Sequence, residues 1–233
     1  MTALLETKAL SRNFGGLKAV SGVDFSLQAG EVRAVIGPNG AGKTTFASLI
    51  TGRVAPSSGS IVFAGEDITS LPAFRRVRRG IAYTFQITSI YGKLSAAENV
   101  ALAAHRAGSG NAAEYLDRVG LAGRAAQTAG TLAYGHQRLL EVAMGLALDP
   151  RLLILDEPTQ GLSDAEIANF VALVRTLSNE ATVLLIEHNM AVVMELAHRI
   201  TVLDRGMVLA EGSPADIRAN PDVQAAYLGT IDA

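Results

Sequence analysis

A glycine-rich loop that ends in a lysine and a threonine is the strongest chemical signal in this 233-residue sequence. Its residues fit the spacing G-x-x-x-x-G-K-[ST]: Gly37, Pro38, Asn39, Gly40, Ala41, Gly42, Lys43 and Thr44. Glycines let backbone N–H groups turn inward around phosphate oxygens. Lys43 would neutralise the β- and γ-phosphates of a nucleotide, and Thr44 would coordinate Mg²⁺. A tight turn with a surface lysine is the alternative, but the complete motif favours phosphate binding.

Two adjacent carboxylates form a second chemical signal. Asp156 and Glu157 directly follow the apolar run Leu152–Leu155. Open α/β sheets bind their ligands at the carboxyl ends of such strands. Asp156 is expected to hold Mg²⁺, and Glu157 is expected to position and deprotonate the water that attacks the γ-phosphate. A charged turn is the alternative, and the presence of Lys43 favours the catalytic interpretation.

The apolar pattern predicts the elements that would position these groups. Val32–Ile36 and Thr182–Ile186 are short apolar runs of the kind found in buried strands. Lys43–Gly52 and Asp164–Leu177 are predicted helices, the second capped by Ser163 or Asp164. Continuous apolar strands that alternate with helices predict an α/β fold with a parallel sheet covered on both faces.

The middle of the chain has a different, helical pattern. Leu139, Val142, Ala143 and Leu146 recur at three- and four-residue spacing, which is the face of a helix. The segment therefore reads as a helical insertion into the α/β core. We expect one domain over residues 1–233, with residues 1–86 and 151–233 in the core and residues 87–150 in the helical subdomain.

The composition excludes several classes of protein. The 20 Lys and Arg residues nearly balance the 22 Asp and Glu residues, which argues against a nucleic-acid binder. The absence of Cys excludes disulfides, thiolate zinc sites and cysteine nucleophiles. No uninterrupted apolar run exceeds five residues, whereas a membrane span needs about 20. A soluble chain is therefore expected, and the N-terminus has no signal-peptide pattern.

Over essentially its whole length the chain resembles the ATP-binding subunits of ABC transporters. The markers of that family occur in order: Gly37–Thr45, Gln86, Leu132–Gln137, Leu152–Glu157 and His188. The closest resemblance is to the subunits of branched-chain amino acid importers, on Phe14–Val20, Tyr134–Arg138, Ile186–Met190, Ile217–Pro221 and Ala226–Gly229. The resemblance implies a P-loop NTPase (RecA-like) core with an antiparallel β subdomain and an inserted α-helical subdomain.

The resemblance also assigns roles to single residues. Phe14 would stack on adenine, with a core or staple phenylalanine as the alternative. Gln86 would reach Mg²⁺ or the attacking water, with an ordinary polar loop residue as the alternative. His188 would contact the γ-phosphate and orient water. Gly135, in the signature segment, would present backbone N–H groups to ATP on an opposing subunit, although Ala133 replaces the usual serine.

The function that follows from the resemblance is hydrolysis of ATP, with Mg²⁺, to energise import of branched-chain amino acids or a similar small solute. The implied partners are transmembrane permease subunits, a second ATP-binding subunit in a homo- or heterodimer, and a separate solute-binding protein, with no nucleic acid. The implied location is cytoplasmic, peripheral on the inner face of the cell membrane. The alternatives are a lipopolysaccharide-export-type or other ABC transporter ATPase and a non-transport ABC ATPase.

Three further sequence features have open interpretations. Ile87–Tyr91 is expected to expose apolar residues to the membrane partner, and packing between the core and the helical insertion is the alternative. The run Arg75–Arg79 is expected to be a solvated helix face, with contact to lipid headgroups as a second interpretation. His105, His136 and His198 lack metal-ligand spacing and are expected to be surface or core residues.

Overall fold

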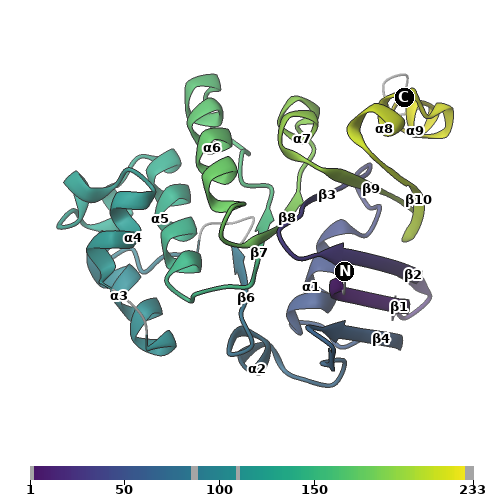
Figure 1. The fold of residues 1–233 in the computed structure, drawn as a ribbon, viewed down its shortest axis with the longest axis horizontal. Coiled ribbons are helices and arrows are strands. Elements are labelled where there is room, and N and C mark those ends of the chain that lie inside the picture. The colour runs from purple at the N-terminus through teal and green to yellow at the C-terminus, as the bar shows by residue number, and fades with distance from the viewer. Residues whose placement is uncertain (1–2, 85–88, 109–110, 229–233) are drawn as a thin grey trace.

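The computed structural model describes residues 3–84, 89–108 and 111–228, and two sheets organise these residues (Figure 1). The larger sheet has the strand order β10-β9-β3-β8-β7-β6. Its strands are β3 (Val32–Ile36), β6 (Ile81–Thr84), β7 (Leu152–Asp156), β8 (Thr182–Ile186), β9 (Arg199–Asp204) and β10 (Met207–Gly212). All neighbouring strands pair in parallel except β9 and β10, which form an antiparallel hairpin.

The register of the parallel strands brings three loops to one edge of the sheet. Val35 of β3 lies beside Ile186 of β8, and Asp156 of β7 also lies beside Ile186. The chain therefore leaves β3, β7 and β8 at the same level. Every residue of these three strands is buried, as expected for strands covered on both faces.

The second sheet is antiparallel and has the order β2-β1-β4-β5. Its strands are β1 (Ala3–Phe14), β2 (Leu17–Gln28), β4 (Ser58–Phe63) and β5 (Glu66–Asp67). Helix α1 (Lys43–Thr51) lies between the two sheets, and its Phe46 packs edge-on against Phe25 of β2, with ring centroids 5.2 Å apart. This apolar layer fixes the helix that begins at the glycine-rich loop.

The opposite face of the larger sheet is covered by α6 (Asp164–Leu177) and α7 (Met190–Leu196). Ser163 caps α6: its hydroxyl accepts from the backbone of Glu166, whose carboxylate accepts from the backbone of Ser163 in return. Two short helices, α8 (Pro214–Ala219) and α9 (Pro221–Leu228), follow the β9–β10 hairpin. The α/β fold class predicted from the sequence is confirmed.

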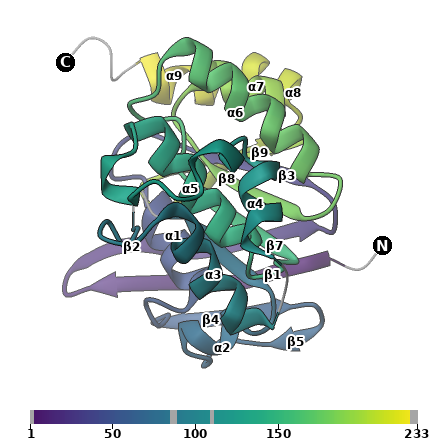
Figure 2. The same ribbon diagram turned by 90° about the vertical axis from the view of Figure 1, so that its left-hand side faces the viewer.

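Three helices gather at the β6 side of the larger sheet and face the viewer in Figure 2. They are α3 (Ala96–Ala107), α4 (Ala112–Arg118) and α5 (Tyr134–Leu146), and they share one apolar cluster with α6. Two 3₁₀ turns, Ala122–Arg124 and Ala129–Thr131, connect α4 to α5. Gly120 follows Val119, the C-cap of α4, and has φ +75°, the left-handed conformation that ends a helix at low cost. No helix in the described part of the chain is long and apolar enough to cross a membrane.

The arginine run around α2 (Ala73–Val77) corrects one prediction. Arg75, Arg78 and Arg79 are exposed, as expected for a solvated helix face, but Arg76 is only 1% exposed. Its guanidinium donates to the carbonyls of Leu49 and Ile50, at 2.7 and 2.8 Å, where α1 ends. The last carbonyls of a helix have no hydrogen-bond donor within the helix and are usually satisfied by water. Here the buried guanidinium of Arg76 donates to them instead.

Candidate nucleotide-binding site

The loop between β3 and α1 requires glycine at two positions because other backbones approach it closely. A Cβ on Gly37, which has φ +151°, would lie 2.1 Å from the Leu203 carbonyl oxygen. A Cβ on Gly42, at φ +97°, would lie 2.3 Å from the Ala19 carbonyl oxygen. Gly42 is also the N-cap of α1 and supplies no side chain to the first turn. The N-terminal N–H groups of α1 are thus free of competition from a capping side chain.

Lys43 is nearly buried, at 7% exposure, and lies over this loop. Its ammonium donates to the carbonyl oxygens of Gly37 and Pro38, at 2.7 and 3.1 Å. Burial lowers the pKa of Lys43, while the charges of Glu157 and Asp156 oppose that shift. A phosphate group in the loop would supply the counter-charge that backbone carbonyls provide only in part.

A cavity of about 550 Å³ opens against the glycine-rich loop and brings most of the predicted ligand-binding residues together. Its lining comprises Phe14, Leu17, Lys18, Ala19, Asn39, Gly40, Ala41, Gly42, Lys43, Thr44, Thr45, Glu157 and Arg205. The volume is within the usual range for small-molecule sites. Phe14 is 45% exposed, so it is not a core phenylalanine. The Arg12 guanidinium carbon lies 4.5 Å from its ring centroid.

Sequence reasoning missed four members of this lining: Leu17, Lys18, Ala19 and Arg205. They come from the start of β2 and from the β9–β10 turn, which are distant in sequence from the loop. Arg205 adopts a positive φ of 47° in that turn. In the sequence, the positive charges of Lys18 and Arg205 were the one hint that these residues could bind phosphate. Their position beside the glycine-rich loop is visible only in the folded chain.

Asp156 ends β7 and is fully buried, and burial raises the pKa of its carboxyl group. The phenol of Tyr83 donates a hydrogen bond to its Oδ2 atom. Among the residues that the structure describes, its Oδ1 atom is buried without a hydrogen-bond partner. A buried carboxylate oxygen without a partner is costly, and a hard cation such as Mg²⁺ would satisfy it. The donor set of Asp156 and Thr44 therefore fits the predicted Mg²⁺ site.

Glu157 begins the loop after β7 with φ +46°, and its backbone N–H donates to the Ile186 carbonyl at 2.8 Å. This turn directs its carboxylate into the cavity wall, where the side chain is 14% exposed. His188 follows β8, and its Nδ1 lies 3.8 Å from Oε2 of Glu157. His188 is 55% exposed at the same edge of the sheet, so it is accessible to a ligand. Gln86 lies outside the described residues.

Sequence reasoning also missed Glu187, which is fully buried between two loops. Its Oε1 accepts hydrogen bonds from the backbone N–H and the hydroxyl of Thr159, in the loop after β7. Its Oε2 accepts from the backbone N–H groups of His188 and Asn189, at 2.8 and 3.0 Å. The carboxylate therefore ties the Glu157 loop to the His188 loop. The signal in the sequence was an acidic residue directly after an apolar run.

Gly135 is the second residue of α5 and is buried against α6. A Cβ on Gly135 would lie 2.2 Å from Oε1 of Glu166, so a larger residue at this position would displace the Glu166 side chain. The N-cap, Ala133, gives no side-chain hydrogen bond to the first turn of α5. Gly135 is not part of the lining of the cavity around Lys43, so one chain does not bring the two together.

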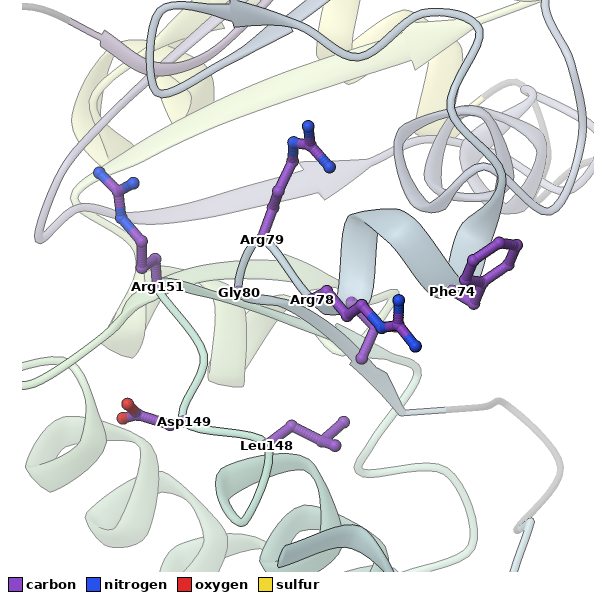
Figure 3. A pocket seen from close by; sticks show the side chains of 8 residues that line it. Phe74, Arg78, Arg79, Gly80, Leu148, Asp149 and Arg151 are labelled. Carbon is purple, nitrogen blue, oxygen red and sulfur yellow. The ribbon is translucent and has the colours of Figure 1, made fainter. Parts of the chain in front are cut away.

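Two further cavities lie away from the glycine-rich loop and share Leu148. The smaller, of about 310 Å³, is lined by Tyr83, Ser89, Ile90, Tyr91, Ala103, Glu141, Met144, Gly145 and Leu148, and is called the groove below. The larger, of about 740 Å³, is lined by Phe74, Val77, Arg78, Arg79, Gly80, Leu148, Asp149 and Arg151 (Figure 3). It lies at the amino ends of β6 and β7, opposite the edge that carries Asp156.

Of the Ile87–Tyr91 segment, the structure describes residues 89–91, and these support both the docking and the packing interpretation. Tyr91 is 59% exposed, as expected for a docking surface. Ile90 is partly buried and packs against the apolar cluster of the helices, as the packing alternative predicts. The histidines are a surface or core set, as expected: His105 is exposed, and Nδ1 of His198 accepts from the backbone of Val32 at 2.9 Å.

Comparisons with known proteins agree with this geometry. A family model described as "ABC transporter" matches residues 20–160. A second model, described as "Branched-chain amino acid ATP-binding cassette transporter", matches residues 207–233. The first match contains the glycine-rich loop, the signature segment and the Asp156–Glu157 pair, and so covers more than half of the chain.

Curated relatives align over nearly the whole length. The high-affinity branched-chain amino acid transport ATP-binding protein BraF of Pseudomonas aeruginosa is 41% identical, covering 97% of this chain and 98% of that protein. The corresponding protein LivG of Escherichia coli K12 is 39% identical with the same coverage. A crystal structure of a nucleotide-free ATP-binding cassette from an ABC transporter superposes with a TM-score of 0.89 at 26% identity, covering 97% of this chain and 99% of that one. The chain is therefore an ATP-binding cassette of the ABC transporter family.

Proposed function

We propose that the chain hydrolyses ATP and thereby energises a membrane transporter for branched-chain amino acids or a similar small solute. The observation that carries the proposal is the cavity that unites Lys43 and Thr44 with Glu157. The substrate class rests on the names of the relatives BraF and LivG, which are branched-chain amino acid transport proteins. The C-terminal family match supports the same class.

In the proposed reaction the glycine-rich loop and Lys43 bind the phosphates, and Phe14 stacks on the adenine. Mg²⁺, held by Thr44 and Asp156, would neutralise the charge of the phosphate oxygens. Glu157 accepts the proton of the attacking water, because its carboxylate lies in the wall of the same cavity. His188 orients that water and donates to the γ-phosphate. Gln86 would assist at the Mg²⁺ ion or the water.

The signature helix α5 is proposed to act on a second ATP-binding subunit. Its first turn offers backbone N–H groups without a side-chain cap, and its Gly135 lies outside the cavity of its own chain. Two subunits in a head-to-tail sandwich would bring each α5 to the γ-phosphate bound by the other. The second subunit is a copy of this chain or a related ATPase.

The membrane partner is proposed to dock on the groove and on the adjoining larger cavity. Phe74, Val77 and Leu148 supply apolar surface to the larger cavity. Arg78, Arg79 and Arg151 add positive charge to its lining, beside the single carboxylate of Asp149 (Figure 3). This chemistry fits a cytoplasmic segment of a permease that combines apolar residues with an acidic side chain. The chain would then be held at the inner face of the membrane, with a solute-binding protein delivering the solute from the other side.

Reconstitution tests this function. The chain, a second ATP-binding subunit (a copy of this chain or a related ATPase), the permease and the solute-binding protein would be placed in proteoliposomes loaded with ATP and Mg²⁺, and uptake of labelled leucine would be measured. We expect uptake that requires ATP and is lost with Lys43→Ala, while the matched surface variant Lys8→Ala retains it. ATP-independent uptake, or full uptake with Lys43→Ala, would reject the assignment. ATP hydrolysis without leucine uptake would retain the ATPase and reject the solute class.

A further inference from the structure

Tyr83 is shared by two sites that the proposed function keeps separate. It lies in β6 beside Ile154 of β7, and its ring forms part of the groove with Ile90 and Tyr91. Its hydroxyl donates to Oδ2 of Asp156 at the nucleotide-binding edge of the sheet. One side chain therefore spans the distance between the groove and the proposed Mg²⁺ carboxylate.

The hydrogen bond leaves the two oxygens of Asp156 unequal. Oδ2 is occupied by the phenol, whereas Oδ1 is buried without a partner among the described residues. A carboxylate held at one oxygen cannot rotate freely, so the phenol selects the oxygen that is available to a cation. Groups that orient a metal ligand in this way typically change metal affinity 10- to 100-fold when they are removed.

The ring of Tyr83 is held between charged and apolar neighbours. The guanidinium carbon of Arg53, in the loop after α1, lies 5.0 Å from the ring centroid. On its other side, Tyr83 lines the groove together with Met144 and Gly145 of α5. A partner that fills the groove would contact this ring directly, and a shift of the ring would move the hydroxyl that holds Asp156.

We propose that Tyr83 is a positioning residue that joins the groove to Asp156, so that a partner bound in the groove changes the affinity of the site for Mg²⁺. The proposal rests on the proposed function, since it assumes that Asp156 binds the cation of a bound nucleotide. It assigns no chemical step to the phenol. Docking in the groove and cation binding at Asp156 would thus be coupled, and by thermodynamic linkage each would change the affinity of the other.

The first experiment measures cation affinity in the isolated full chain. Mn²⁺ replaces Mg²⁺, the non-hydrolysable analogue AMP-PNP replaces ATP, and electron paramagnetic resonance reports free Mn²⁺. We expect Tyr83→Phe to raise the Mn²⁺ dissociation constant about 10-fold. The affinity for AMP-PNP in EDTA should stay unchanged. The matched variant Tyr115→Phe removes the hydroxyl of a buried tyrosine in α4 and should leave both constants at the wild-type values.

Asp156→Asn separates failure of this inference from failure of the function. If Asp156→Asn weakens Mn²⁺ binding and Tyr83→Phe does not, the positioning role is wrong and the cation site stands. If neither variant changes the Mn²⁺ constant, the cation site itself is wrong. A loss of AMP-PNP affinity in EDTA with Tyr83→Phe would indicate general damage and would also overturn the positioning role.

The second experiment tests the coupling in the assembled transporter. The Mn²⁺ dissociation constant is compared between the isolated chain and the permease-bound chain, for the wild type and for Tyr83→Phe. We expect the permease to shift the constant at least 3-fold in the wild type and by a smaller factor in Tyr83→Phe. The same shift in both proteins, or no shift in the wild type, would overturn the coupling.

Discussion

Nδ1 of His188 lies 3.8 Å from Oε2 of Glu157, across the carboxyl ends of two neighbouring parallel strands. The contact depends on the register that sets Asp156 beside Ile186, and on Glu187, which binds both loops. A carboxylate and an imidazole at this separation can share one water molecule. That arrangement would serve proton abstraction and orientation of the water together.

His188→Ala should therefore lower the turnover of ATP more than its binding. We expect kcat to fall about 100-fold, because an orienting donor is lost, with KM changed little. Steady-state hydrolysis at several ATP concentrations gives both constants. His105→Ala removes an exposed histidine of α3 and should behave as the wild type. Equal kinetics for His188→Ala and the wild type would remove His188 from the mechanism.

Arg76→Met should destabilise the fold without touching the cavity around Lys43. The guanidinium of Arg76 donates hydrogen bonds to the carbonyls of Leu49 and Ile50 at the end of α1. Methionine cannot donate, so the substitution leaves these buried acceptors unpaired. We expect the free energy of unfolding to fall by about 2–4 kcal/mol. Urea denaturation measures this change. Arg75→Met, on the exposed face of α2, should change it by about 0.5 kcal/mol or less. Similar effects of both would contradict the structural role of Arg76.

The double variant Arg78→Glu/Arg151→Glu should weaken binding of the permease. Both arginines line the larger cavity, and reversal of their charge would repel an acidic docking segment. We expect less permease retained on the tagged chain after detergent extraction, and unchanged ATP hydrolysis by the isolated chain. Arg175→Glu, on α6, reverses an exposed charge elsewhere and should retain the permease. Full retention by the double variant would exclude this cavity from the interface.

The capping box of α6 predicts a pH dependence. Hydrogen bonds from the backbone and side chain of Ser163 lower the pKa of Glu166 below its ordinary value of 4.5. A lowered pKa stabilises the folded chain above pH 4.5, and this contribution is lost as the pH falls through the folded-state pKa. Glu166→Gln should therefore lower Tm at pH 7, and the difference from the wild type should shrink below pH 4.5. A difference that is independent of pH would show that the charge of Glu166 is not the cause.

The sequence predicted the fold well where the pattern was local. Val32–Ile36, Thr182–Ile186 and the helix Asp164–Leu177 were located from apolar periodicity and a capping serine, and the structure has the same bounds. Periodicity works there because both faces of the sheet are covered, so the strands read as continuous apolar runs. The roles of the predicted site residues toward ATP and Mg²⁺ stay predictions.

Side chains that depend on contacts distant in sequence could not be predicted. Arg76 is part of a basic run, and only the packing of α2 against the end of α1 makes it a buried cation. Tyr83 and Asp156 are 73 positions apart and meet because β6 pairs with β7 in register. Nothing in the local composition of either segment carries that register.

The role of Glu157 as the proton acceptor is tested most directly by single-turnover hydrolysis of radiolabelled ATP by the chain and by Glu157→Gln. The amide keeps the size of the carboxylate but cannot accept a proton, so we expect the rate of hydrolysis to fall about 100- to 10,000-fold, with ATP affinity unchanged. Glu195→Gln, an exposed carboxylate of α7, should hydrolyse ATP at the wild-type rate. A Glu157→Gln chain that hydrolyses ATP at a near-normal rate would contradict this role, because no proton acceptor would then be needed at this position.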